Sequence, residues 1–236
     1  MKINKRRLVF RKFNSCFLLE NELSLLVSKR INLSIEKKGY ASIALSGGKT
    51  PLSLYKKLSK KDIEWKRTNL YLVDERAVHL TSNDSNQHNI LSALAKKTSD
   101  FREFRSFDYK KKLKGIIELI NRDKKFSFPF NFTLLGMGDD GHFASIFPNL
   151  EDTKLLLDCD NKDYISYTKT NEKIPHRFTM TYKTISQSEM IVIYIKGEKK
   201  LSLIKNIIEN EVSPSLYPIK KIFNDFKNEM RLYWCK

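Results

Sequence analysis

The chain has 236 residues, of which 41% are hydrophobic, so it can bury one sizeable core and is too apolar for general disorder. A net charge of +17 admits nucleic acid, a membrane surface or an anionic metabolite as partner, but the lysines are spread along the sequence, as solvated helix faces and ends would place them. No segment approaches the roughly 18–20 apolar residues of a membrane span, and the basic N-terminus lacks the apolar core of a secretory signal. We therefore expect a soluble, cytoplasmic protein without a membrane partner.

The cysteines carry no metal-binding or disulfide pattern. Cys16, Cys159 and Cys235 are odd in number, widely spaced and in no Cys-x-x-Cys pair. This spacing predicts neither a disulfide framework nor a zinc site, and it fits a reducing cytosol.

Helices and strands are expected to alternate along the chain. Apolar residues at helical spacing over 16–31 predict a first helix that Gly39 ends. Further helices are expected over 51–59, 85–96, 109–121 and 198–209. Strands are expected over 40–46, 69–74, 131–136 and 190–196, with weaker candidates at 164–169 and 177–181 and an edge strand at 231–235. This alternation predicts an α/β fold: a single domain over 1–236 with a doubly wound, mostly parallel sheet flanked by helices.

Ligands of such folds bind at the carboxyl ends of the strands, and the first candidate there is SGGKTP (46–51). Gly47 and Gly48 let the backbone turn tightly, and Thr50 is placed to cap a helix whose N–H groups would hold a phosphate. A P-loop is excluded, because Ile43 stands where that motif needs its first glycine and Pro51 removes a backbone donor. Both an ordinary tight turn and an anion site stay open for this segment.

The second candidate, Asp74-Glu75-Arg76, ends the strand expected over 69–74. The guanidinium of Arg76 can bind a phosphate through two parallel hydrogen bonds, and Asp74 can orient a base. The structural alternative is a salt-bridged loop. His79, Asp84 and His88 follow at a spacing that matches no standard metal-ligand set, so we expect surface or capping roles and no metal.

The third candidate is LLGMGDDGHFASIFP (134–148). Its glycines at 136, 138 and 141 formally match a dinucleotide fingerprint, but Pro148 closes off the long helix that such a site requires, so we do not expect NAD binding. His142 can titrate near neutrality and suits a general base; a structural histidine is the alternative. Ser145 is a poor nucleophile candidate, because no Gly-x-Ser-x-Gly elbow surrounds it.

Together these segments resemble the 6-phosphogluconolactonase family of the glucosamine/galactosamine-6-phosphate isomerase superfamily. The family pattern runs through SGGKTP (46–51), DERAV (74–78), DSN (84–86), GMGDDGHFASIFP (136–148), PHRFTMT (175–181) and GEKK (197–200). The related glucosamine-6-phosphate deaminases would be expected to read DEY and GHIAFNEP at the second and third sites. Asp139 and Phe143 depart from the usual family residues, and Phe143 is expected to add bulk beside the histidine.

The resemblance implies a modified Rossmann-like, glucosamine-6-phosphate deaminase-like fold and hydrolysis of 6-phospho-D-glucono-1,5-lactone to 6-phospho-D-gluconate, the second step of the oxidative pentose phosphate pathway. The partner would be this phosphorylated sugar lactone, with no cofactor and no metal. We expect His142 to activate water and Asp74 to orient the imidazole or the substrate. The residues expected to hold phosphate and developing charge are Gly47, Gly48, Thr50, Arg76, Arg177 and Lys200.

Two other functions are weighed against this one. A sugar-phosphate isomerase or deaminase could use the same crevice. A basic nucleic-acid-binding protein is not favoured, because aromatic residues are not interleaved with the basic ones as a stacking platform requires. The sequence leaves the oligomeric state and the reason for the positive charge open.

Overall fold

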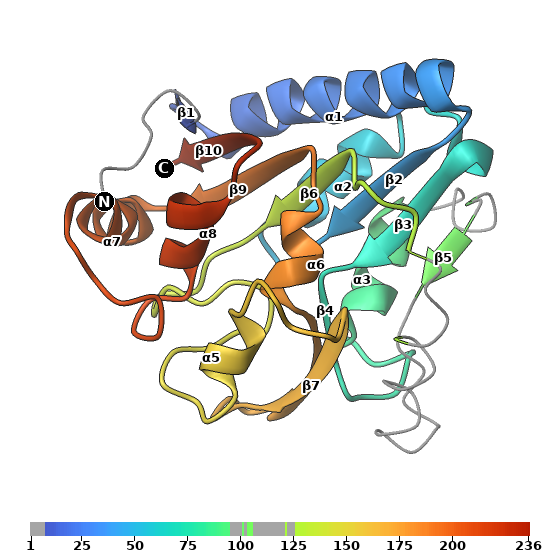
Figure 1. Cartoon of the computed structure of the whole chain (residues 1–236). Helices are drawn as coiled ribbons and strands as arrows, with labels where there is room; N and C mark the ends of the chain where they lie inside the picture. Colours follow the sequence, from blue (N-terminus) through green and yellow to red (C-terminus); the bar gives the residue numbers. More distant parts are fainter. Residues whose placement is uncertain (1–7, 95–100, 102, 106–120, 122–125) are drawn as a thin grey trace.

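Seven parallel strands form the central sheet of the computed structural model, which describes residues 8–94, 101, 103–105, 121 and 126–236. Their order across the sheet is β1 (Leu8–Phe13), β10 (Glu229–Cys235), β9 (Met190–Lys196), β6 (Phe132–Leu135), β2 (Ala41–Leu45), β3 (Thr68–Leu72) and β5 (Glu103–Arg105). The inner strands β2, β3 and β6 are buried along their whole length, as strands covered on both faces must be. The α/β class and the parallel sheet are confirmed (Figure 1).

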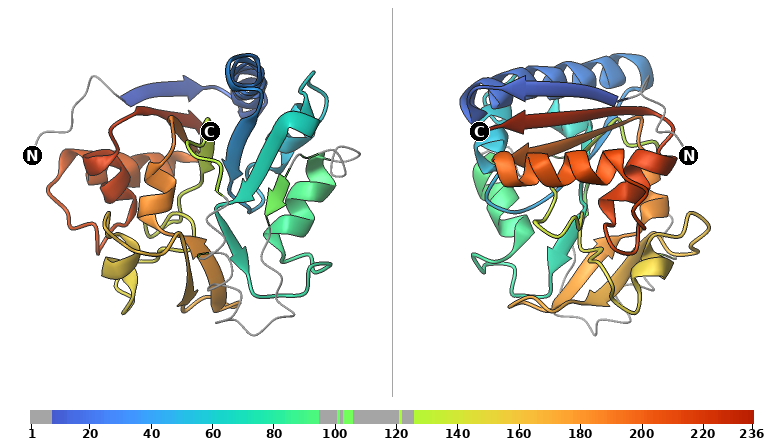
Figure 2. Two further views of the ribbon diagram at one scale, coloured as in Figure 1. Left: turned by 45° about the vertical axis from the view of Figure 1, so that its right-hand side comes forward. Right: turned by 90° about the vertical axis from the view of Figure 1, so that its left-hand side faces the viewer.

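Helices cover both faces of this sheet. α1 (Cys16–Lys38) and α7 (Glu198–Glu209) lie on opposite faces (Figure 2). α2 (Leu52–Leu58) packs against α1, α3 (Asn86–Leu94) packs against α2, and α8 (Ile219–Asp225) packs against α7. Gly39 ends α1 in the left-handed conformation, with φ of 79°, as its position in the sequence predicts. Among the helices that the structure describes, none combines the length and apolar character needed to cross a bilayer.

A smaller antiparallel sheet lies below the main one in Figure 1. It consists of β4 (Asp74–Arg76), β8 (His176–Met180) and β7 (Ile165–Lys169), in that order. The two weaker strand candidates are therefore confirmed. The salt-bridged loop considered as the alternative for residues 74–76 is instead a short strand. Two short helices, α5 (Thr153–Leu156) and α6 (Tyr182–Ser186), and a 3-10 turn (Trp65–Arg67) complete the described elements.

The expected edge strand at 231–235 is in fact internal. β10 lies between β9 and β1, and the edge is formed by β1, which the sequence analysis did not identify. Most of β1 is exposed and it carries Arg11 and Lys12, so it shows no buried apolar pattern. The helix expected over 109–121 lies outside the described residues except for Asn121.

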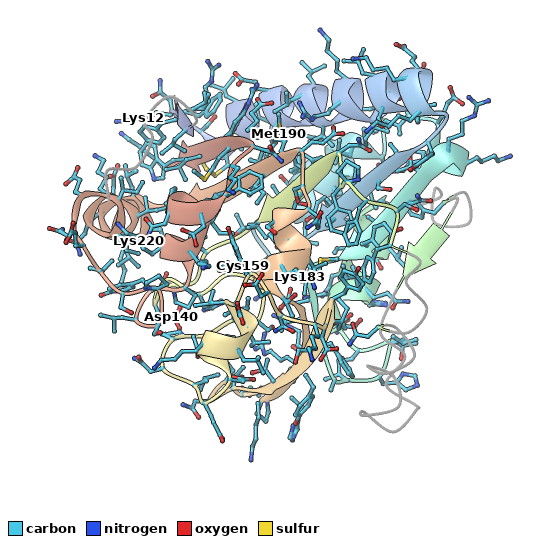
Figure 3. All side chains as sticks on the ribbon, viewed as in Figure 1. Lys12, Asp140, Cys159, Lys183, Met190 and Lys220 are labelled. Atoms are coloured by element: carbon cyan, nitrogen blue, oxygen red, sulfur yellow. A yellow bond between two sulfur atoms is a disulfide. The ribbon has the colours of Figure 1, made fainter. Side chains whose placement is uncertain are left out.

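A buried lysine completes the C-terminus of α7, whose bounds match the expected helix over 198–209. The Lys220 ammonium, 6% exposed, donates to the carbonyls of Ile207 at 2.6 Å and Asn210 at 2.8 Å (Figure 3). A helix leaves its last carbonyls without intrahelical partners, and a cation there also opposes the helix dipole. α8 is thereby fixed against the end of α7.

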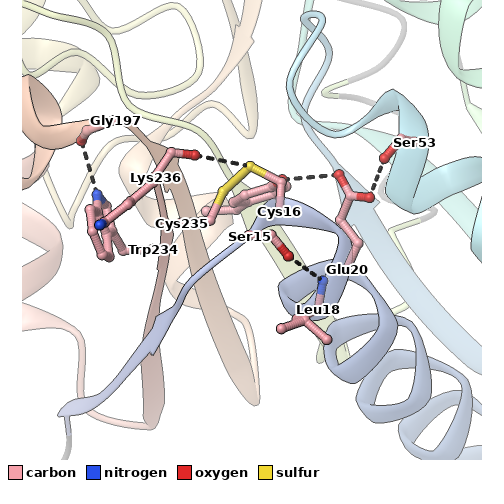
Figure 4. The surroundings of a disulfide bond; sticks show 10 residues. Ser15, Cys16, Leu18, Glu20, Ser53, Gly197, Trp234, Cys235 and Lys236 are labelled. Atoms are coloured by element: carbon pink, nitrogen blue, oxygen red, sulfur yellow. Dashed lines mark hydrogen bonds between the residues drawn. A yellow bond between two sulfur atoms is a disulfide. The ribbon is translucent and has the colours of Figure 1, made fainter.

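A disulfide joins Cys16 to Cys235, with 5.2 Å between the Cα atoms, so the expectation of no disulfide is wrong (Figure 4). The two residues are 219 positions apart in the sequence. They meet because β1 runs parallel to β10 in register, with Phe13 beside Cys235, and α1 begins directly after β1. The unpredicted edge strand is therefore what brings the cysteines together.

Candidate active site at the carboxyl ends of the strands

A pocket of about 260 Å³ opens at the carboxyl ends of the central strands. The chain leaves β2 toward β3 on one side of the sheet, and it leaves β6 toward β9 and β10 on the other. Such a point of divergence is where open α/β sheets bind ligands. All the site residues expected from the sequence line this pocket: Gly47, Gly48, Thr50, Asp74, Arg76, His142, Arg177 and Lys200.

The turn after β2 depends on its glycines. Gly48 has φ of +87°, a conformation that side chains rarely adopt, and a Cβ on Gly47 would lie 1.9 Å from Oδ1 of Asn86. Thr50 does not cap the following helix as expected, because Pro51 is the N-cap residue of α2 and no side-chain hydrogen bond is made there. Thr50 instead lines the pocket.

Strand alternation separates the side chains of β4. Asp74 and Arg76 line the pocket, while Glu75 does not. The Glu75 carboxylate accepts hydrogen bonds from the Ser85 hydroxyl and from the backbone N–H groups of Arg76, Asn86 and Gln87. Burial raises the pKa of Glu75, and these hydrogen bonds oppose the rise. Glu75 thus fixes the start of α3 against β4.

Asp74 is held by neutral side chains rather than by the histidine. Its Oδ2 accepts from the Ser145 hydroxyl at 2.6 Å, and its Oδ1 accepts from the Asn86 amide at 3.3 Å. Of the two roles expected for Asp74, orientation of the imidazole is therefore wrong: that contact belongs to Asp140. Ser145 is fully buried and its hydroxyl is engaged with Asp74.

His142 pairs with Asp140, a residue that the sequence analysis did not select. The Nδ1 atom of His142 lies 2.7 Å from Oδ1 of Asp140, which also accepts from the His142 backbone N–H at 3.1 Å. The ring stacks on Phe147, with 4.0 Å between centroids. Asp140, labelled in Figure 3, precedes His142 by two residues in one glycine-rich turn, and that spacing was the available signal.

Electrostatics keep the Asp140 carboxyl ionised. Burial by itself would raise its pKa, but hydrogen bonds from His142 and the charge of the imidazole lower it below the ordinary value of 3.8. A carboxylate beside Nδ1 favours the imidazole tautomer with its proton on that nitrogen, which leaves Nε2 as the proton acceptor.

Two arginines face each other across neighbouring strands. Arg76 of β4 is the register partner of Arg177 of β8, and both line the pocket. Like charges placed directly opposite one another destabilise a sheet. Burial lowers the pKa of Arg177 and the charge of Arg76 acts in the same direction, although Asp74 opposes both. Nε of Arg76 is buried and has no hydrogen-bond partner in the described part of the chain. An anionic ligand would supply the missing negative charge and acceptor.

Lys200 lies at the start of α7 and ties that helix to the histidine turn. Its Nζ donates to the Met137 carbonyl at 2.6 Å and lies 3.7 Å from Oδ1 of Asp139. Asp139 is exposed and also lies 3.5 Å from Lys199. Phe143 is fully buried and is not part of the pocket wall, so the expectation that it adds bulk beside the histidine is wrong.

The described residues bring no cluster of metal-binding side chains to the pocket. Nδ1 of His79 lies 2.7 Å from the Thr81 hydroxyl, and the carbonyl of Asp84 accepts from Arg76. Where the chain is described, one group of potential ligands lies close together, Asp158-Cys159-Asp160, and it is exposed and outside the pocket wall.

A parallel α/β sheet with a histidine–carboxylate pair and opposed arginines at its strand ends defines an enzyme scaffold for small anionic molecules. Residues 18–234 match the family described as glucosamine-6-phosphate isomerases/6-phosphogluconolactonase. The chain belongs to this family.

Individual relatives agree with the assignment. A 6-phosphogluconolactonase from Chlamydia pneumoniae is 31% identical over 86% of this chain and 78% of its own. One from Thermotoga maritima is 30% identical over 85% of this chain and 91% of its own. The crystal structure of a 6-phosphogluconolactonase from Shewanella baltica is 26% identical and matches with a TM-score of 0.92, covering 100% of both chains.

Proposed function

We propose that this protein hydrolyses 6-phospho-D-glucono-1,5-lactone to 6-phospho-D-gluconate, the second step of the oxidative pentose phosphate pathway. It is thus a carboxylic ester hydrolase that acts in the cytoplasm. The observation that carries the proposal is one pocket that holds both the His142–Asp140 pair and the opposed arginines Arg76 and Arg177. The first can activate water, and the second can bind a phosphorylated substrate.

In the hydrolysis, His142 acts first as a base and then as an acid. Nε2 takes a proton from water while the water oxygen attacks the C1 carbonyl, which gives a tetrahedral oxyanion. The bond from C1 to the ring oxygen then breaks, and the imidazolium returns its proton to that oxygen. Asp140 keeps Nδ1 protonated and stabilises the imidazolium. The net reaction adds one water to the ester and needs no metal or cofactor.

The remaining pocket residues bind charge. Arg76, Arg177 and Lys200 neutralise the phosphate and the developing oxyanion, and the backbone N–H groups of the Gly47–Gly48 turn contribute further donors. Thr50 contributes its hydroxyl from the same wall. Asp74, held by Ser145 and Asn86, presents a fixed carboxylate to the substrate hydroxyls. Its role is to orient the substrate.

The test is hydrolysis of freshly made lactone, coupled to 6-phosphogluconate dehydrogenase and NADP reduction, with the spontaneous rate subtracted. We expect clear activity from the wild type and a loss of about 10²–10⁴-fold in His142→Ala, because the base is removed. Circular dichroism controls for folding. Activity that survives in the variant would reject His142 as the base, and a folded wild type without activity would overturn the function. A sugar-phosphate isomerase or deaminase would give a different product and no signal in the coupled assay.

A further inference from the structure

A second hollow of about 680 Å³ adjoins the proposed active site. We call it the lysine groove; its wall consists of Cys16, Phe17, Glu20, Lys49, Thr50, Ser53, Lys56, Lys57, Lys60, Tyr194 and Lys196. Thr50, Tyr194 and Lys196 also line the catalytic pocket, so the two hollows share a wall. Four separate stretches of chain contribute: the start of α1, the turn after β2, α2, and the end of β9.

The charge in this groove is unbalanced. Five lysines line it against one carboxylate, Glu20. That carboxylate is 5% exposed and accepts hydrogen bonds from the hydroxyls of Tyr194 and Ser53 (Figure 4). Glu20 is therefore turned toward its own partners.

The groove lysines form no ion pair within the described residues, although other lysines of the protein do. Lys38 pairs with Glu189 at 2.8 Å, and Lys221 pairs with Asp225 at 2.6 Å. The groove thus concentrates positive charge that the described part of the chain does not neutralise. Such clustering of like charge in a concave surface attracts a counter-ion.

Part of the groove is already ordered for binding. The Lys57 ammonium donates to the Asn21 side chain at 2.7 Å and lies 4.0 Å from the centre of the Phe17 ring. Lys56 lies in the last turn of α2 and Lys60 lies in the turn that follows its C-cap residue Ser59, and both line the groove. Lys binds phosphate as a compact point charge, so several ammonium groups around one hollow can each contact a different phosphate of a linked chain.

We infer that the lysine groove binds an anion carrying several linked phosphate groups, either an inorganic polyphosphate or the phosphate chain of a nucleotide. The single phosphate of the proposed substrate belongs to the arginine pair in the smaller pocket. A ligand in the groove touches the shared wall at Thr50 and Lys196, so its binding changes the affinity of the catalytic pocket for its own anion.

The experiment is calorimetric titration of the full chain with inorganic tripolyphosphate at low salt. The test variant is Lys56→Gln/Lys60→Gln, since neither residue lines the catalytic pocket. The matched control is Lys29→Gln/Lys37→Gln, which removes the same charge from two exposed positions on α1 outside the groove. We expect roughly tenfold weaker binding in the test variant, and wild-type affinity within about twofold in the control.

Absence of binding, or equal weakening in both double variants, would overturn the site, because the second result reports net charge alone. A third arm, Arg177→Gln, separates the two hollows. Binding that is lost in this variant and retained in Lys56→Gln/Lys60→Gln would place the anion in the catalytic pocket and also overturn the inference. ATP titrated in parallel distinguishes the sources: equal affinity indicates recognition of the phosphate chain, and tighter binding indicates a contact to the base. The readout is binding, so it stands apart from any failure of the lactonase assay.

Discussion

The contact between His142 and Asp140 assigns a function to each nitrogen of the imidazole. Nδ1 is committed to the carboxylate at 2.7 Å, so proton transfer in the proposed reaction falls to Nε2. Asp74, the carboxylate that the sequence made prominent, is engaged with Ser145 and Asn86. In the proposed reaction, one of the two carboxylates therefore serves the base and the other faces the substrate.

Asp140→Asn tests the first of these roles. We expect kcat to fall about 10–100-fold, because an amide cannot replace the charged hydrogen bond to Nδ1. The pKa of Asp140 is lowered from its ordinary value of 3.8, so its carboxylate stays ionised between about pH 5 and 8 and the variant should be slower than the wild type throughout this range. The coupled assay over this range measures both rates. A variant that keeps the wild-type kcat across this range would contradict the role of Asp140 as partner of the base.

Because Arg76 and Arg177 lie opposite each other, we expect replacement of Arg177 to change activity and stability by different amounts. In Arg177→Gln we expect kcat/KM to fall about 10–100-fold, as a hydrogen bond to a charged group is lost. The melting temperature should change little, because the relief of repulsion from Arg76 offsets the lost contact to the Ile174 carbonyl. Thermal unfolding and the coupled assay on the same sample measure both. A large loss of stability would show that Arg177 serves mainly the fold.

The position of the site was predictable, but not every pairing within it. His142, Asp74 and Arg76 each follow a strand, and strand ends meet at one edge of a parallel sheet. The bond from Ser145 to Asp74 joins residues 71 positions apart, and no spacing in the sequence marks it. Asp140 was accessible in principle, because it shares a turn with His142.

At the scale of elements, the turn that carries His142 (residues 136–142) depends on a glycine at the position where the imidazole and the Asp140 carboxylate pack against the backbone. A Cβ on Gly138 would lie 2.1 Å from Nδ1 of His142 and 2.6 Å from Oδ1 of Asp140, whereas one on Gly136 would meet nothing within 4 Å. The backbone N–H of Gly138 also donates to the His142 carbonyl at 2.9 Å. The catalytic pair therefore requires the absence of a side chain at one particular position.

Gly138→Ala should accordingly reduce kcat at least as much as Asp140→Asn, by about 10-fold or more, because the methyl group displaces the imidazole from the carboxylate. Gly136→Ala is the matched control from the same turn. It should retain kcat within a few-fold, since its methyl group enters the open space of the pocket and touches neither His142 nor Asp140. The coupled assay compares the two variants. Equal losses would mean that general stiffening of the turn matters more than the contact with His142.

Elements buried on both faces were well predicted, and those at the sheet edge were not. The bounds of β9 and α7 match the expected ranges 190–196 and 198–209, because continuous β-branched and amphipathic patterns mark them. β1 pairs with one neighbour only and is largely exposed, so its sequence need not be apolar. β4 was not recognised as a separate strand, because its pairing partner, β8, lies about a hundred residues further along the chain.

At the scale of the whole molecule, the positive charge has two distinguishable components. Some lysines pair with acids on the surface, as Lys38 and Lys221 do, and such pairs contribute little to stability. The lysines of the groove have no such partners in the described chain and lie beside the proposed active site. Their position gives part of the net charge of +17 a local function, which composition alone could not show.

The Cys16–Cys235 disulfide closes almost the whole chain into a loop, because the two cysteines are 219 positions apart. A cross-link over so long a loop restricts the unfolded chain and is expected to contribute about 2–5 kcal/mol to the free energy of unfolding. The bond holds the start of α1 to the end of β10, the strand that supports the sheet edge. In a reducing environment the bond would open and this contribution would be lost.

Cys235→Ser should therefore lower the melting temperature under oxidising conditions, and a reductant should bring the wild type to the same value while leaving the variant unchanged. Cys159→Ser is the control, because that thiol is exposed and unpaired. It should melt with the wild type and respond to the reductant in the same way. Thermal unfolding with and without dithiothreitol measures all three proteins. A wild type that is insensitive to the reductant and melts with Cys235→Ser would show that the bond does not form in solution, and the edge strand β1 would then be held to β10 by backbone hydrogen bonds and packing alone.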